Sequence, residues 1–124
     1  MPDPTKILIV DDEPDICYFL TFNLSRKGYL TSFSNSLSDA AKKIEKDSPS
    51  ILLLDNHLPD GKGVDFASAI IHKNPHLKII MITAHDSPED RARAYNNGIS
   101  YFLPKPFTID AINQAVDQLI KEEQ

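Results

Sequence analysis

Three short apolar runs rich in β-branched residues constrain the fold of this chain more than any other feature of the sequence. They occupy residues 7–10, 51–54 and 79–82. Their apolar residues are consecutive rather than alternating with polar ones, which predicts strands that are buried on both faces. Strands of this kind occur in parallel sheets that are covered by helices on each side.

The segments between these runs have the spacing of amphipathic helices. The first helix is expected to bury a face made of Ile16, Phe19, Leu20 and Leu24. Gly28 follows at the point where a helix end favours a residue with positive φ. Ser87 and Thr108 are placed to cap two later helices, because their side-chain oxygens can accept free backbone N–H groups.

Two weaker strands, near residues 30–34 and 100–103, complete an alternation of strand and helix that repeats five times. That order predicts an α/β fold: a single doubly wound sheet of five parallel strands with five helices. We expect residues 1–124 to form one domain, which is the natural count for a chain of this length.

Composition narrows the class of protein further. The 124 residues are 41% hydrophobic and 25% charged, with a net charge of −5. An acidic balance argues against direct nucleic-acid binding, which depends on clustered cations. The single cysteine, Cys17, excludes an internal disulfide, and no apolar stretch has the length of a membrane span or a signal peptide. These features predict a cytoplasmic domain with no membrane contact.

Polar side chains follow the expected strands. They are Asp11 and Asp12 after the first strand, Asp55 after the third, Thr83 after the fourth and Lys105 after the fifth. In open parallel sheets the binding site lies at the carboxyl ends of the strands. The sequence therefore predicts that these five residues converge on one edge of the sheet.

Three carboxylates at one rim require a compensating cation. Two carboxylates a few ångströms apart repel by about 1 kcal/mol in water and about 4 kcal/mol at an effective dielectric constant of 20. Mg²⁺ prefers oxygen ligands and is usually held by one or two carboxylates, so we expect Mg²⁺ here, with Lys105 left to pair with an anion. An anion that binds both, beside a nucleophilic carboxylate and a hydroxyl, is most simply a phosphoryl group, which an aspartate can accept as an acyl phosphate.

Four stretches of the sequence together resemble the receiver domain of bacterial two-component response regulators. They are ILIVDDE (7–13), LLLDNHLPDGKG (52–63), IIMITAH (79–85) and GISYFLPKPF (98–107). The resemblance covers essentially the whole chain. It implies a flavodoxin-like strand order of 2-1-3-4-5. It also implies that the protein is a phosphoprotein of a phosphorelay. Such a protein assists its own phosphorylation and dephosphorylation but is not an enzyme acting on a separate small molecule.

The resemblance also implies which class of protein donates the phosphoryl group and which residues bind Mg²⁺. Asp55 would be phosphorylated by a sensor histidine kinase or a histidine phosphotransfer protein. Asp12 and Asp55 would ligate Mg²⁺ through their side chains and His57 through its backbone carbonyl. Asp11 would act on the ion mostly through water.

A second group of implied roles concerns catalysis and switching. Lys105 would pair with the phosphoryl group, and Thr83 would reorient to donate a hydrogen bond to it. Phe102 occupies the position of an aromatic switch that would rotate inward as Thr83 moves. The peptide bond between Lys105 and Pro106 is expected to be cis.

Two histidines depart from the common family pattern. His57 stands where methionine is frequent, and His85 lies two residues after Thr83. Our hypothesis is that these two imidazoles flank the mouth of the phosphoryl pocket and alter how water reaches the acyl phosphate. A zinc site made from the pair is disfavoured, because the sequence offers no further plausible ligand.

The segment from Ser87 to Asn97 has the poorest apolar face of the expected helices. A weakly anchored element beside the site is where small shifts can be amplified. We therefore expect this helix, the fifth strand and the last helix to form the output surface.

Three other functions were compared with this one. A phosphohydrolase with an aspartyl-phosphate of the haloacid dehalogenase type needs a carboxylate where His57 stands. A flavodoxin-like redox or nucleotide-binding protein needs a glycine-rich phosphate loop, and Asp11-Asp12-Glu13-Pro14 would repel the ligand. A receiver that only docks partners would not require the full set of site residues.

The sequence leaves the larger assembly open. Because LIKEEQ directly follows the last expected helix, we expect no DNA-binding output domain within these 124 residues. A stand-alone regulator, a phosphorelay intermediate and a domain cut from a longer regulator all fit, as do a separate target protein and an output domain. A monomer and a phosphorylation-dependent dimer are both compatible with the sequence.

Overall fold

Five parallel strands form the central sheet of the protein. The computed structural model describes residues 4–123, and the side chains of residues 4–121. The strands are β1 (Lys6–Val10), β2 (Leu30–Ser34), β3 (Ile51–Asp55), β6 (Lys78–Thr83) and β7 (Tyr101–Pro104), and they lie in the order β2-β1-β3-β6-β7. Counted along the chain, this is the predicted order 2-1-3-4-5, so the fold class is confirmed.

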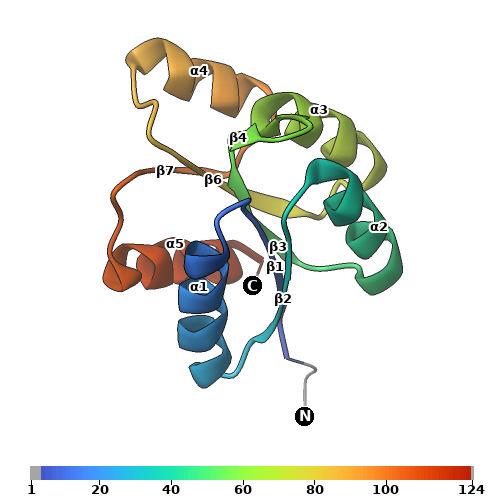
Figure 1. Ribbon diagram of the computed structural model, residues 1–124, viewed down its shortest axis with the longest axis vertical. Coiled ribbons are helices and arrows are strands. Elements are labelled where there is room, and N and C mark those ends of the chain that lie inside the picture. Colours follow the sequence, from blue (N-terminus) through green and yellow to red (C-terminus); the bar gives the residue numbers. More distant parts are fainter. Residues whose placement is uncertain (1–3, 124) are drawn as a thin grey trace.

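Five helices cover the two faces of this sheet (Figure 1). On one face lie α1 (Pro14–Arg26) and α5 (Ile109–Glu123). On the other lie α2 (Leu37–Asp47), α3 (Gly63–Lys73) and α4 (Pro88–Asn96). In the described residues, none of these helices combines the length and the apolar character needed to cross a membrane.

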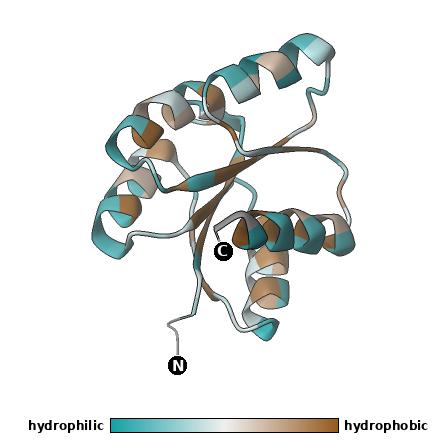
Figure 2. Ribbon diagram, turned by 180° about the vertical axis from the view of Figure 1, so that it is seen from behind, coloured by the Kyte–Doolittle hydropathy of each residue, from teal (hydrophilic) through white to brown (hydrophobic). Residues whose placement is uncertain are grey.

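Each face of the sheet has its own hydrophobic core. Successive residues of a strand point to opposite faces. Leu8 and Leu52 therefore join the core under α2, α3 and α4, whereas Ile9 and Leu53 join the core under α1 and α5. All five residues of β3 are buried, and Figure 2 shows the apolar sheet enclosed by helices whose outer faces are hydrophilic. This two-sided burial explains why the apolar runs do not alternate.

The expected helix signals are present. Ser87 and Asp90 form a capping box at the start of α4, in which each side chain accepts a backbone N–H of the other residue. The Thr108 hydroxyl oxygen accepts the N–H of Ala111 at 3.1 Å, at the start of α5. Gly28 has a φ of 96° just after α1, as its position predicted.

Two details differ from the sequence prediction. Phe19 was expected in the core but is 45% exposed, and the buried face of α1 is made of Cys17, Leu20 and Leu24. The buried stripe is thus narrower than the apolar pattern, and the small thiol of Cys17 fits against the sheet in place of an aromatic ring. The segment after β3, which had no predicted structure, forms a small antiparallel hairpin of β4 (His57–Leu58) and β5 (Gly61–Lys62).

Candidate functional site

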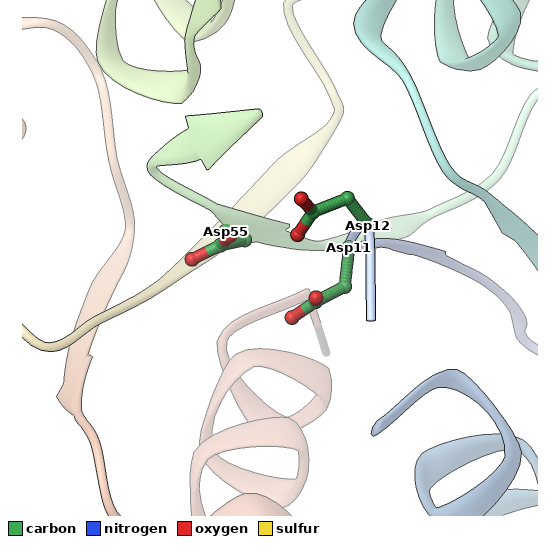
Figure 3. A group of neighbouring side chains, drawn as sticks. All are labelled: Asp11, Asp12 and Asp55. Atoms are coloured by element: carbon green, nitrogen blue, oxygen red, sulfur yellow. The ribbon is translucent and has the colours of Figure 1, made fainter. Parts of the chain in front are cut away.

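The three aspartates meet at the carboxyl edge of the sheet. β1 and β3 pair in register with Val10 opposite Leu54, so Asp11 and Asp55 emerge side by side. Carboxylate oxygens of Asp11, Asp12 and Asp55 all lie within 4.8 Å of one another. Figure 3 shows Asp11 and Asp12 leaving the end of β1 next to Asp55 at the end of β3. The predicted convergence is what parallel pairing of these strands produces.

Lys105 reaches into this group from the loop after β7. Its Nζ lies 3.4 Å from Asp55 Oδ1 and 3.6 Å from Asp11 Oδ2. The Lys105 N–H donates to the carbonyl of Thr83 at 2.8 Å, which ties the loop to the end of β6. The Lys105–Pro106 peptide bond is cis, as the resemblance implied.

The electrostatic balance of the cluster favours an additional cation. Burial raises the pKa of Asp11 and of Asp55, and attraction to Lys105 only partly offsets this. Burial alone would lower the pKa of Lys105, but attraction to Asp11 and Asp55 raises it overall, so the lysine stays charged. One ammonium group does not neutralise three carboxylates. An all-oxygen donor set with excess negative charge fits Mg²⁺.

Thr83 completes the pocket on the side of β6. Its side chain is buried, and β3 pairs with β6 so that Asp55 lies opposite Ile82, the neighbour of Thr83. Thr83 Oγ1 accepts the backbone N–H of His85 at 3.1 Å. Thr83 is thus one residue beyond the position opposite Asp55, and its hydroxyl is held by its own loop.

The rings of His57 and His85 lie against each other. Their ring centroids are 4.5 Å apart with a 59° angle between the planes. Both line a pocket of about 200 Å³ that also includes Thr83 and Phe102. The imidazole of His57 lies outside the aspartate cluster, so only its backbone is a candidate ligand for a metal held there.

The ring of Phe102 already lies inside the molecule, since only 4% of the residue is exposed. The Arg91 guanidinium lies 5.0 Å from the centre of the ring, and Arg91 is paired with Asp86 in the loop before α4. The Phe102 N–H donates to the phenol oxygen of Tyr95 at 3.1 Å. The inward rotamer expected of a switched state is thus the rotamer of this structure.

Sequence reasoning did not single out the residues that shape the loop after Asp55. Asn56 accepts the N–H of Val64 through Oδ1 and the N–H of Gly63 through its carbonyl. Asp60 accepts the first N–H groups of α2, from Leu37 at 2.9 Å and from the next residue at 3.0 Å. These backbone bonds lower the pKa of Asp60. The Asn and Asp-Gly in LLLDNHLPDGKG were the available signal, since both favour turns.

Comparison with known proteins identifies the family of this chain. The family model of the response regulator receiver domain matches residues 7–117. One relative is PhoP of Bacillus subtilis, the alkaline phosphatase synthesis transcriptional regulatory protein. This chain and PhoP are 30% identical over 119 residues, which are 96% of this chain and 50% of PhoP. The chain thus spans about half the length of that relative.

Two solved structures show the same fold. A two-component response regulator from Clostridium difficile superposes with a TM-score of 0.93 at 25% identity, covering 97% of this chain and 98% of that one. The beryllofluoride-activated NtrC4 receiver domain dimer gives a TM-score of 0.90 at 32% identity, covering 96% and 98%. This chain belongs to the response regulator receiver domain family of two-component systems.

Proposed function

We propose that Asp55 accepts a phosphoryl group from a histidine kinase or a histidine phosphotransfer protein, in the presence of Mg²⁺. The main support is the position of Lys105, whose ammonium lies 3.4 Å from Asp55 and 3.6 Å from Asp11. A phosphoryl group brings about −1.5 to −2 charges at neutral pH. Lys105 can pair with one of its oxygens while the carboxylates hold the metal.

The transfer itself needs few protein groups. A carboxylate oxygen of Asp55 attacks phosphorus, an O–P bond forms, and the N–P bond to the donor imidazole breaks with its electron pair returning to nitrogen. Asp12, Asp55 and the carbonyl of His57 would hold Mg²⁺, with Asp11 acting mostly through water, and the ion would supply charge neutralisation for the phosphoryl oxygens. The Thr83 hydroxyl would leave its bond with the His85 N–H to donate to a phosphoryl oxygen.

An apolar depression beside the site is where we place the phosphodonor. It is lined by Ile16, Phe19, Ala84, Pro106 and Phe107, next to Lys105. The rings of Phe19 and Phe107 have centroids 6.5 Å apart, which joins α1 to the loop after β7. A helical donor that delivers a phosphohistidine to Asp55 would cover this surface.

A donor-specific experiment tests that placement. The variant Phe19→Ser should slow transfer from a histidine kinase that phosphorylates the wild type, but should leave labelling by acetyl phosphate unchanged. Phe22→Ser is the matched control, because Phe22 is also an exposed ring on α1, at 61%, and does not line the depression. Equal loss in both variants would contradict the placement.

Contacts between the site and α4 suggest how the signal would travel. Release of the Thr83 hydroxyl frees the N–H of His85, and with it the loop that holds Asp86. Asp86 positions Arg91 over the ring of Phe102. The only buried side chain of α4 in the described residues is Ala94, so among the helices α4 has the fewest core contacts to hold it. We propose α4, β7 and α5 as the output surface, with a coupling of about 1–3 kcal/mol.

The core of the proposal is tested by phosphate incorporation. Wild-type protein should take up label from acetyl phosphate with Mg²⁺ and lose most of the signal without it, whereas Asp55→Ala should take up none. Repeated turnover on a generic phosphate ester would favour a phosphohydrolase instead. Absence of labelling in the wild type would favour a module that only docks partners.

The wider assembly is part of the proposal. PhoP is a transcriptional regulator of twice this length, and the NtrC4 receiver domain is a dimer in its beryllofluoride-activated form. We infer that this domain works in the cytoplasm with an output domain or a separate target. We also infer that phosphorylation shifts it from monomer to dimer, which ultracentrifugation with beryllofluoride would test.

A further inference from the structure

A second group of polar side chains lies beside the aspartate cluster, in the pocket of about 200 Å³ that His57 and His85 line. Two other residues of the lining, Lys62 and Arg93, carry positive charge at neutral pH. Lys62 pairs with His57 across the β4–β5 hairpin, so their side chains leave the same face of that hairpin. Arg93 belongs to α4, and His85 to the loop before it. The pocket thus gathers nitrogen donors from three segments of the chain.

The charge of this pocket is unbalanced in favour of cations. Within the described residues, neither Lys62 nor Arg93 forms an ion pair. Among these residues, the one carboxylate in the lining is Asp90, which the capping box of α4 holds through the Ser87 hydroxyl at 2.8 Å. Hydrogen bonds from Ser87 are the main cause of the lowered pKa of Asp90, so this carboxylate is ionised at neutral pH. Two cations therefore face one carboxylate, in a chain whose net charge is −5.

We propose that this pocket binds a small tetrahedral oxyanion of the phosphate class. Lysine and arginine form charge-assisted hydrogen bonds with phosphate oxygens, and Lys62 and Arg93 are free to do so. His57 and His85 can each donate one further N–H while their rings are neutral. The volume of about 200 Å³ is several times the roughly 30 Å³ that one water molecule occupies in the liquid, so the anion fits together with a few waters.

The proposed anion site borders the phosphoryl site without coinciding with it. The lining of the pocket includes Thr83 but neither Asp55 nor Lys105. The Lys105 ammonium lies 3.4 Å from Asp55, within the aspartate cluster. The cations that would bind the oxyanion are thus different from the cation that would pair with a phosphoryl group.

A bound oxyanion would fasten α4 to the hairpin. Arg93 lies on α4, whose only buried side chain in the described residues is Ala94, and Lys62 lies on β5 directly before α3. An ion bound to both cations would join these segments and slow the local opening of α4. It would also oppose a movement of α4 on phosphorylation. This last consequence rests on the proposed function, whereas binding of the ion does not.

The binding test uses inorganic phosphate, titrated at neutral pH and constant ionic strength into unphosphorylated protein with Mg²⁺ and followed by NMR. Amide signals around the pocket should shift and saturate in wild type, and Lys62→Gln and Arg93→Gln should each weaken binding about tenfold or more. Lys46→Gln is the matched control, since Lys46 is an exposed lysine of α2 outside the pocket and its loss changes the net charge equally. Shifts that do not saturate in wild type, or affinities that are equal in all variants, would overturn the proposal.

A second arm separates this site from the phosphoryl site. Lys105→Gln should bind inorganic phosphate in the pocket as tightly as wild type does, and loss of binding in this variant alone would place the ion at the aspartate cluster and overturn the proposal. Methyl phosphate, titrated in parallel, distinguishes a free ion from the phosphoryl end of a larger compound. Saturable binding of either probe that depends on Lys62 and Arg93 supports the pocket, and binding of neither overturns it.

Amide exchange tests the link to α4. Saturating phosphate should slow exchange in α4 several-fold in wild type and leave it unchanged in Arg93→Gln. Equal exchange in wild type with and without phosphate would overturn the fastening of α4. If acetyl phosphate never labels Asp55, the proposed function fails, while the phosphate titration still decides the anion site.

Discussion

The phenol oxygen of Tyr95 accepts the backbone N–H of Phe102 at 3.1 Å, which connects α4 to the outermost strand of the sheet. β7 lies at the edge of the sheet, next to β6. N–H groups on a free edge lack partners within the sheet. Tyr95 supplies such a partner, although 49% of the residue is exposed. The helix with the fewest buried side chains, α4, is thus tied to β7 by a single hydrogen bond, which depends on the phenol oxygen of Tyr95.

Removing that oxygen should loosen α4. We expect Tyr95→Phe to lower the free energy of unfolding by about 1 kcal/mol, the typical net value of one hydrogen bond. Amide exchange at Phe102 and through α4 should rise in the unphosphorylated protein. Tyr101→Phe, a phenol on β7 itself, serves as control. Exchange that is the same in the wild type and Tyr95→Phe would show that this bond does not hold the helix.

Gly63 is required by the close approach of its backbone to the end of β3. A Cβ at this position would lie 2.5 Å from the carbonyl oxygen of Asp55 and 3.0 Å from Leu54 Cγ. Because backbone must shift to relieve that overlap, we expect Gly63→Ala to destabilise the protein by about 2–4 kcal/mol. It should also weaken Mg²⁺ binding, since the displaced atoms belong to Asp55.

Gly28→Ala is the matched control for that substitution. Gly28 has positive φ, but an added Cβ would meet no atom within 4 Å. The cost should therefore be only about 1 kcal/mol of backbone strain. Urea denaturation of both variants measures the difference, and equal losses would show that steric overlap at Gly63 is not the cause.

The aspartate cluster should make stability depend on pH. Burial raises the pKa of Asp11 and Asp55, so the folded state favours their protonated forms. The stability from protonation is fully present below the ordinary carboxyl pKa and is lost as pH rises through the raised pKa values. Without Mg²⁺, Asp55→Asn should therefore be more stable than wild type at pH 7, by about 1 kcal/mol.

That difference should shrink as the pH falls through the raised pKa of Asp55, because the wild-type carboxyl then becomes protonated. Mg²⁺ at 100 times its dissociation constant should reverse the order at pH 7, because a ligand at that excess stabilises wild type by about 2.7 kcal/mol. Thermal unfolding with and without Mg²⁺ measures both effects. A difference that is constant between pH 4 and 7 would contradict the assignment of raised pKa values.

The histidine pair should also protect an acyl phosphate from water. Because the rings of His57 and His85 contact each other beside Thr83, we expect His57→Met and His85→Ala to shorten the lifetime of phosphorylated Asp55 several-fold. The measurement is the decay of labelled protein after the donor is removed, in buffer treated with chelator and resupplied with Mg²⁺ only. Unchanged lifetimes in both variants would end this hypothesis.

Much of the fold could be predicted from the sequence because its signals are local. Consecutive apolar residues in β1, β3 and β6 follow from burial on two faces, and Gly28, Ser87 and Thr108 mark helix ends through their own backbone chemistry. The meeting of Asp11, Asp55 and Lys105 at one edge of the sheet could be predicted from topology, since the carboxyl ends of parallel strands lie at the same edge. The family resemblance added the strand order and the cis peptide bond.

Other features depend on how the elements pack, and no local pattern encodes that. The exposure of Phe19 is set by the rotation of α1 about its axis, which turns Cys17, Leu20 and Leu24 toward the sheet. The inward ring of Phe102, the bond from its N–H to Tyr95 and the contact of His57 with His85 each join residues from different elements. The sequence determined which groups reach the carboxyl edge of the sheet, because each of them directly follows a strand and the alternating order of strands and helices makes the strands parallel. Only the tertiary structure decided which of them touch, because side-chain contacts between helices and loops depend on the packing of the whole molecule.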